Sequence, residues 1–421
     1  MTTTYLQKVE VSGYRSCRAT RFVPNSRLSA LIGINGAGKT NLLNAIRLIS
    51  PQQIRRYGIA SDDKSSVQTQ VVAWFDVGAK KIGMRMRLFL TPASRTGDEV
   101  RSFTEEFNFS GIDGSKGWKH FPLMCFQDDA VLTDDIEQQM YMYQRMARTK
   151  SRMNFPGELA PVDFTIVRDQ KNLEALKAIS KFRRGITYYS ASQFTDPTRC
   201  PSNFEIDSEG RLSESYGTSK VHVKFLFDLY SLRNSNIDLY NDYVTFVSRG
   251  QLGLISRLSW KAIELSSYAA EVKSGGRVSK VRKYKTLIIP KIQIGSSHLT
   301  FNQLSEGTFK TLATVFYIMT DASSCLLIEE PEVCVHHGLL TSIVNTIKAY
   351  SVTKQVIFST HSDLVLDQLD PENVFVVEAL KTGTSATGLA KWVGPRGKVA
   401  LGTYLNETGT LGEYWRTGGL S

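Results

Sequence analysis

The sequence predicts an α/β protein in which helices cover a mixed, largely parallel sheet and a mainly helical insertion interrupts the chain. Strand-like and helix-like segments alternate at both ends of the 421 residues, which is typical of a parallel sheet. The short apolar run Leu28–Ile34 leads into a glycine-rich loop and then into a segment with helical spacing. We therefore expect an N-terminal lobe over 1–115, an insertion over 116–284 and a C-terminal lobe over 285–421.

The N-terminal lobe is expected to combine strands with one helix after the loop. Apolar residues alternate at Leu6, Val9 and Val11, which is the period of a half-buried strand. Residues 78–81 contain Gly78 and join two strand patterns, as a hairpin turn does. The other elements predicted here are a helix at 41–49 and strands at 28–34, 71–77 and 82–90.

The insertion is expected to be mainly helical, whereas strands and helices alternate in the C-terminal lobe. In the insertion we predict helices at 137–147, 170–182 and 221–247 and a strand at 185–190. In the C-terminal lobe we predict strands at 286–294, 325–328, 355–359 and 373–377 and helices at 306–319 and 339–349. No heptad pattern continues over three or four repeats, so a long coiled coil is not expected.

Composition excludes several classes of protein. Apolar residues make up 42% and charged residues 22%, which is ordinary globular usage. No apolar run approaches the roughly 20 residues that a membrane span needs, and the first residues lack the apolar stretch of a secretory signal. The five cysteines include no C-x-x-C pair, which argues against a disulfide framework or a zinc ribbon. We expect a cytoplasmic protein without membrane partners.

The charge balance suggests an acidic partner. The formal net charge is +11, and such a surplus attracts polyanions. Residues 273–285 hold six basic residues and no acidic one. Together with Lys80, Lys81, Arg183 and Arg184, this cluster is a candidate surface for DNA or for an acidic protein. A solvated basic loop without a ligand explains the same pattern equally well.

The most specific motif is the glycine-rich segment Gly33–Thr40, which reads GINGAGKT. It fits G-x-x-x-x-G-K-[ST] between a strand and a helix, which is the context of a phosphate-binding loop. Lys39 is expected to reach the β- and γ-phosphates of a nucleotide, and the Thr40 hydroxyl to hold Mg²⁺. Backbone N–H groups of the loop would cradle phosphate oxygens. These groups belong to Asn35, Gly36, Ala37, Gly38, Lys39 and Thr40.

A second motif ends an apolar strand with adjacent carboxylates. The segment Cys325–Glu332 reads CLLIEEPE. A carboxylate at the end of such a strand can help to hold Mg²⁺, and its neighbour can orient or deprotonate a water molecule. We assign Glu329 to the metal and Glu330 to the water. Without the phosphate loop, a solvated acidic turn would explain this pattern as well.

Two further motifs flank the carboxylates. In Leu304–Lys310, reading LSEGTFK, Ser305 is a good N-cap for a helix whose free N–H groups can face an anion. The segment STHS closes the next strand and contains His361, which can contact a γ-phosphate or order the water. Considered alone, His361 is more often a structural histidine than a catalytic one.

The order GINGAGKT, LSEGTFK, LLIEEPE and STHS resembles the ABC-type P-loop ATPase heads of the SMC, RecF and OLD families. The resemblance implies ATP and Mg²⁺ as cofactors and an ATPase activity. It also implies that Ser305 and Gly307 contact ATP held by another subunit, which requires at least a homodimer. His361 would be the switch histidine, and Gln193 in YYSASQF would be a Q-loop residue near the metal. Glu329 departs from the Asp that is common in these heads, which leaves fast turnover in doubt.

Within this group the chain most resembles the OLD-like branch, because EEPE, the histidines His336 and His337, and STHS recur there. OLD and Gabija nucleases append a Toprim domain, but no D-x-D pair follows His361 here, and a two-metal nuclease needs clustered carboxylates. We therefore expect any cleavage in a separate protein.

The ATPase (AriA) subunits of PARIS-type phage-defence systems are the nearest resemblance. This resemblance implies an oligomeric sensor and scaffold. Such a scaffold restrains a Toprim-type effector nuclease until an acidic phage protein or DNA triggers release of the nuclease. Two alternatives stay open at this point. One is a DNA-binding repair ATPase of the RecF or SMC type, and the other is a nucleotide-bound scaffold with negligible turnover.

Overall fold

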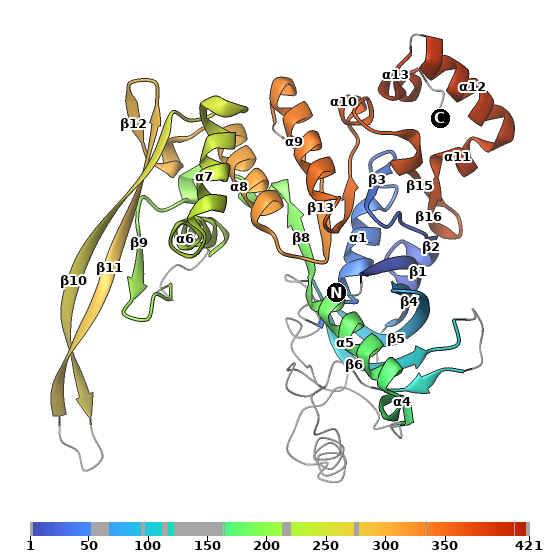
Figure 1. Cartoon of the computed structure of the whole chain (residues 1–421), viewed down its shortest axis with the longest axis horizontal. Coiled ribbons are helices and arrows are strands. Elements are labelled where there is room, and N and C mark those ends of the chain that lie inside the picture. Colours follow the sequence, from blue (N-terminus) through green and yellow to red (C-terminus); the bar gives the residue numbers. More distant parts are fainter. Residues whose placement is uncertain are drawn as a thin grey trace. The chain divides into compact units, whose positions relative to one another are not determined.

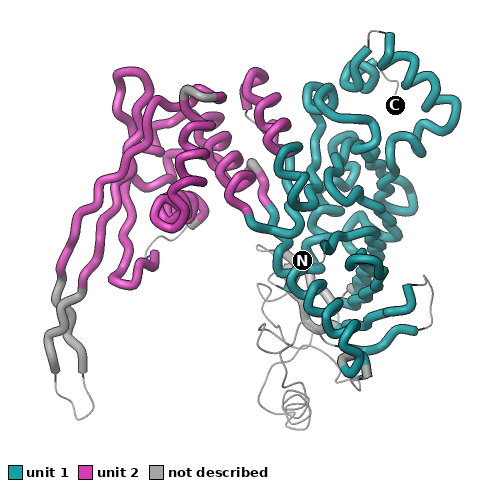
Figure 2. The backbone as a smooth tube through the Cα atoms, in the orientation of Figure 1, with its two compact units in different colours: residues 1–188, 322–330, 348–421 teal, residues 189–321, 331–347 magenta. Residues whose placement is uncertain are grey.

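The computed structural model forms two compact units (Figure 2). Unit 1 comprises residues 1–188, 322–330 and 348–421, and unit 2 comprises 189–321 and 331–347. The structure describes residues 3–51, 67–93, 97–111, 117–121, 163, 165–212, 220–272, 278–333, 335–407 and 409–417. The division into two lobes and an insertion stays a prediction. Two compact units do not by themselves show which segment is a lobe and which is an insertion.

Two six-stranded sheets organise the first unit (Figure 1). One is antiparallel, in the order β2 (Cys17–Phe22), β1 (Thr4–Tyr14), β4 (Val67–Val77), β5 (Lys80–Ala93), β6 (Gly97–Asn108) and β7 (Lys119–His120). The other has the order β16 (Gly383–Gly388), β15 (Val374–Leu380), β3 (Leu28–Ile32), β14 (Gln355–Ser359), β13 (Cys325–Glu329) and β8 (Ile186–Ser190). In this second sheet β15, β3, β14 and β13 pair in parallel, while β16 is antiparallel to β15.

The predicted α/β class with a mixed sheet and helices is confirmed. Every residue of β3 and β14 is buried, which is why these strands read as continuous apolar runs. The described helices of unit 1 are α1 (Lys39–Arg47), α4 (Thr165–Arg168), α5 (Gln170–Arg184), α10 (Asp363–Leu366), α11 (Leu389–Trp392), α12 (Gly394–Glu407) and α13 (Leu411–Arg416). The helix predicted at 137–147 lies outside the described residues.

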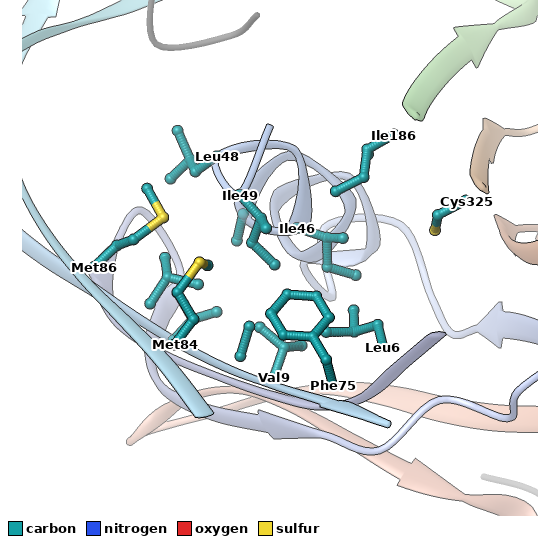
Figure 3. Packing of buried hydrophobic residues seen from close by; sticks show 14 of the residues in the cluster. Leu6, Val9, Ile46, Leu48, Ile49, Phe75, Met84, Met86, Ile186 and Cys325 are labelled. Atoms are coloured by element: carbon teal, nitrogen blue, oxygen red, sulfur yellow. The ribbon is translucent and has the colours of Figure 1, made fainter. Parts of the chain in front are cut away.

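Helix α1 anchors the phosphate-loop region in the core of unit 1. Its residue Ile46, and Ile49 just after the helix, face Phe75 of β4 and the two methionines Met84 and Met86 of β5 (Figure 3). All of these side chains are fully buried. The apolar face of α1 thus fixes the helix against the antiparallel sheet, and the loop before the helix starts from a rigid base.

Unit 2 joins helices to a small antiparallel sheet. Its strands are β9 (Phe204–Asp207), β10 (Arg257–Val272), β11 (Val278–Ile294) and β12 (Ser297–Leu299). Its helices are α6 (Lys220–Ser235), α7 (Ile237–Thr245), α8 (Glu306–Thr320) and α9 (His337–Tyr350), whose last turn belongs to unit 1. No helix among the described residues of either unit is long and apolar enough to cross a membrane.

Two features of unit 2 differ from the sequence prediction. The single helix expected at 221–247 is two helices, because Asn236 ends α6 and caps α7 by accepting a hydrogen bond from Leu239 N. Strand β10 was not predicted at all. It forms a long ladder with β11 from Arg257↔Gln293 to Val272↔Val278. Of residues 257–266, only Leu258 is buried, so pairing rather than an apolar face defines this part of the strand.

Arg183 does not contribute to a basic surface, which corrects one sequence expectation. Its side chain on α5 is 1% exposed and forms an ion pair of 2.6 Å with Glu105 of β6. The Arg183 Nε also donates to the carbonyl oxygen of Ile49, 2.8 Å away, just beyond α1. The buried charge is therefore satisfied inside the fold and joins α5, the antiparallel sheet and the end of α1.

Replacing Arg183 by Met should lower the free energy of unfolding by about 3–5 kcal/mol, because Glu105 would be left buried without its charged partner. The matched control is Lys181→Met on the same helix, where the side chain is exposed and the expected change is within about 0.5 kcal/mol. Denaturant unfolding followed by tryptophan fluorescence measures both. Equal midpoints for the two variants would contradict this account of the pair.

Candidate functional site

Three parallel strands of unit 1 end in the same row. Strand pairing aligns Glu329 of β13 with Ser359 of β14, and Ser359 with Leu31 of β3. The carboxyl ends of parallel strands meet at one edge of a sheet, so the segments that follow them lie together. This edge therefore collects the glycine-rich loop after β3, the second carboxylate after β13, and His361 after β14.

The glycine-rich loop turns sharply between β3 and α1. Gly36 and Gly38 have φ angles of 82° and 104°, a region that favours glycine. Lys39 is only 6% exposed, and its ammonium group donates to the carbonyl oxygens of Gly33, at 2.6 Å, and Ile34, at 3.3 Å. No atom lies within 4 Å of the position that a Cβ of Gly36 would take, so the turn faces open space there.

The loop is supported from behind by residues that the sequence did not indicate. Thr384 of β16 donates through its backbone N–H to Ser16 O and through its hydroxyl to Ser16 Oγ, both at 2.8 Å. Asn41 of α1 donates to the same Ser16 Oγ at 2.7 Å. A Cβ on Gly38 would lie 2.1 Å from Thr384 Oγ1, so only glycine fits between the loop and this support.

Glu329 is held between two hydroxyl groups. Thr40 donates to its Oε1 and Tyr188 of β8 donates to its Oε2. The Tyr188 ring in turn lies under the guanidinium group of Arg47, with 4.0 Å from the Arg47 Cζ to the ring centroid. The two residues that were predicted to hold Mg²⁺, Thr40 and Glu329, are thus in direct contact.

Glu330 has an unusual backbone conformation at the end of β13. Its φ is +45°, a left-handed value that side chains other than glycine rarely adopt. Its N–H donates to Ser359 O at 3.1 Å, which keeps it beside β14. Its Oε1 lies 3.6 Å from His361 Nδ1, so the predicted water carboxylate and the predicted switch histidine are neighbours.

The remaining predicted site residues belong to unit 2. Ser305 is the N-cap of α8 and accepts a hydrogen bond of 3.2 Å from Thr308 N, as its sequence position predicted. Gly307 lies in the first turn of that helix. Gln193 is exposed within the 3₁₀ turn Ala191–Phe194, just after β8.

The edge of unit 1 brings together oxygen groups of the kind that bind Mg²⁺. Mg²⁺ prefers oxygen ligands and is usually held by one or two protein oxygens together with substrate phosphates. Thr40 Oγ1 and the Glu329 carboxylate supply such oxygens next to a lysine and a set of loop N–H groups. No cluster of three or more histidine, cysteine, aspartate or glutamate side chains suited to a metal occurs within the described part of the chain.

Substituting Gly38 by Ala should destabilise the protein more than substituting Gly36 by Ala. Both positions have positive φ, which costs an L-residue about 1–2 kcal/mol. Only at Gly38 would the added methyl group also displace Thr384, because nothing surrounds Gly36. Thermal unfolding of the two variants measures the difference. Equal losses would show that the support by Thr384 is not tight.

Part of the chain matches a known domain family. Residues 160–367 match the family described as "AAA domain, putative AbiEii toxin, Type IV TA system". The matched range contains α8, β13, β14 and His361, whereas the glycine-rich loop lies before it.

The comparison with individual proteins finds a DNA replication and repair protein RecF from Thioalkalivibrio sulfidiphilus. It is 32% identical over 106 residues, which cover 24% of this chain and 29% of that protein. The chain thus spans less than a third of the length of this relative.

Among solved structures, an SMC head domain from Thermotoga maritima is 13% identical, with a TM-score of 0.40 over 91% of this chain and 99% of that one. An Smc head from Pyrococcus furiosus, bound to the C-terminal domain of ScpA, is 11% identical, with a TM-score of 0.43 over 96% of this chain and 100% of the other. The chain is thus similar to an AAA domain over 160–367 and to a RecF protein over a stretch of 106 residues.

Proposed function

We propose that this protein is an ATP-hydrolysing sensor and scaffold of a bacterial anti-phage complex that controls a separate effector nuclease. The observation that carries the ATPase part is the common edge of β3, β13 and β14, where Thr40 of the glycine-rich loop donates a hydrogen bond to Glu329. The defence role rests on the resemblance of the motifs to OLD-like and PARIS-type ATPases.

The chain's own residues would bind the nucleotide at the loop. Backbone N–H groups of residues 35–40 and the ammonium group of Lys39 would hold the phosphates, and Thr40 and Glu329 would hold Mg²⁺. When bound, the metal supplies charge neutralisation at the β- and γ-phosphates. The loop fits this role because its glycines already expose a turn with open space at Gly36.

Hydrolysis would depend on Glu330 and His361. The Glu330 carboxylate would accept a proton from the attacking water or orient that water, and His361, 3.6 Å away, would keep the carboxylate turned toward the site. The positive φ of Glu330 aims its side chain differently from a continuing strand residue. Strain of this kind is common at functional positions and supports the assignment.

The complete site is proposed to need two copies of the chain. Ser305 and Gly307 begin a fifteen-residue helix, α8, whose first N–H groups can face an anion. In this proposal they contact ATP that is bound by Lys39 of a second copy, so ATP joins the copies into at least a homodimer. Gln193, exposed after β8, is proposed to approach the metal once the site is assembled.

A basic segment supports an acidic partner. Residues 257–294, which contain β10 and β11, hold nine basic and two acidic residues, a large share of the net charge of +11. A two-stranded ribbon with this charge suits either DNA or an acidic protein that imitates DNA. The basic cluster predicted at 273–285 lies partly outside the described residues. From 278 onward it pairs with β10, and its last member, Lys285, forms an ion pair of 2.7 Å with Glu205 of β9.

A DNA-repair ATPase is the second candidate, and the same basic segment favours it. It predicts ATP-dependent binding to duplex or gapped DNA that weakens steeply as salt rises. The defence proposal instead predicts tight association with an effector protein. Binding of the purified chain to DNA at low and high salt, with and without ATP, distinguishes the two.

Replacing Glu330 by Gln should leave ATP binding within about twofold of wild type and slow hydrolysis by at least about 100-fold, because the variant can no longer accept a proton. Lys39→Ala should lose both binding and hydrolysis. The matched control is Lys398→Ala, an exposed lysine of α12, which should behave as wild type. Wild-type turnover in Glu330→Gln would show that this carboxylate does not act on the water and would favour a scaffold without turnover.

Cells that carry the chain together with its neighbouring gene should resist phage infection, and Lys39→Ala should abolish the protection while Lys398→Ala should not. Efficiency of plating measures the protection, and affinity purification tests whether the neighbouring product stays bound. Full protection with Lys39→Ala would contradict a nucleotide-dependent sensor. A neighbour without any nuclease site would contradict the proposed effector.

A further inference from the structure

We infer that Tyr188 is a positioning residue for magnesium in this site, because its hydroxyl fixes the orientation of the Glu329 carboxylate. The inference rests on the proposed function and gives a role to a residue that stands in YYSASQF but received no role from the sequence. Tyr188 belongs to β8, the neighbour of β13 in the mixed sheet, so its position is set by the sheet rather than by a loop.

The two oxygens of Glu329 have separate partners. Thr40 donates to Oε1, and Tyr188 donates to Oε2. With both oxygens engaged, the plane of the carboxylate is defined before any ligand is present. Residues that hydrogen-bond to metal-ligating carboxylates commonly fix their orientation and raise metal affinity.

Arg47 places the Tyr188 ring in turn. Its guanidinium carbon lies 4.0 Å from the ring centroid, a close cation–π contact from the last turn of α1. A cation over the face of a phenol draws electron density away from the oxygen, so the Tyr188 hydroxyl becomes a better donor to the carboxylate. The same helix carries Thr40 in its first turn, so α1 controls both partners of Glu329.

This arrangement also explains the glutamate at a position where related heads often carry an aspartate. A side chain from β13 must reach Thr40 on α1 and Tyr188 on β8 at once. The additional methylene group of glutamate extends its carboxylate beyond the end of the strand. An aspartate at 329 would hold its carboxylate closer to the backbone of β13 and would lose one of the two hydroxyl partners.

The test uses Tyr188→Phe, which removes the hydroxyl and keeps the ring over Arg47. The affinity of the full chain for a non-hydrolysable ATP analogue is measured by calorimetry in EDTA and in Mg²⁺. We expect unchanged affinity in EDTA and an affinity about tenfold weaker than wild type in Mg²⁺. The matched control is Tyr404→Phe, which removes a tyrosine hydroxyl that donates to Glu413 at 3.4 Å on the C-terminal helices and should change neither value.

A double-mutant cycle separates a positioning role from a general loss of stability. If Tyr188 acts through the carboxylate, adding Tyr188→Phe to Glu329→Gln should weaken Mg²⁺-dependent binding no further than Glu329→Gln alone. Melting temperatures within a few degrees of wild type exclude unfolding as the cause. Additive losses would overturn the inference.

Failure of this inference can be told apart from failure of the proposed function. If Mg²⁺ raises the affinity for the analogue as much in Tyr188→Phe as in wild type, the role of Tyr188 is overturned and the proposed ATPase stands. A wild-type chain that does not bind the analogue at all, with Lys39→Ala behaving identically, overturns the proposed function and this inference together.

Discussion

The in-register pairing of three parallel strands determines where the chemistry of this protein can be. Leu31, Ser359 and Glu329 occupy one row across β3, β14 and β13, and each strand is buried on both faces. Because a register shift would turn every side chain to the opposite face, the core fixes this alignment strongly. The loop, the carboxylates and His361 then meet without any further device, since each follows its strand directly.

The second layer of the site is a set of contacts that hold these segments in place. Gln355 of β14 is 2% exposed and exchanges two hydrogen bonds of 2.9 Å with the backbone of Leu6, where the register of β1 shifts. It thus joins the parallel sheet to the antiparallel one. The ion pair of Arg183 with Glu105 joins α5 to the antiparallel sheet. The Ser16–Thr384 contact supports the glycine-rich loop. These polar links are buried and satisfied, which makes the edge rigid.

The sequence predicted the part of the site that is local in the chain. The loop and its lysine could be recognised because strand, glycines and helix follow one another, and the paired carboxylates because an apolar strand precedes them. Tyr188 could not be recognised, because its partner Glu329 lies 141 positions away and a tyrosine in a strand has no pattern of its own. Helix α7 was merged with α6 because one polar residue, Asn236, ends a helix without interrupting the apolar spacing. Strand β10 was missed because pairing with β11, and not burial, defines it.

The hydrogen bonds of Lys39 have a consequence for ligand association. The ammonium group is already desolvated and bound to two carbonyl oxygens of its own loop, so the turn has its shape before a nucleotide arrives. In the proposed function, an incoming phosphate would replace these acceptors by stronger anionic ones and would not have to order the main chain. A flexible loop would lose conformational entropy when the ligand binds. Here the loop is ordered during folding, and the burial of α1 offsets that loss of entropy.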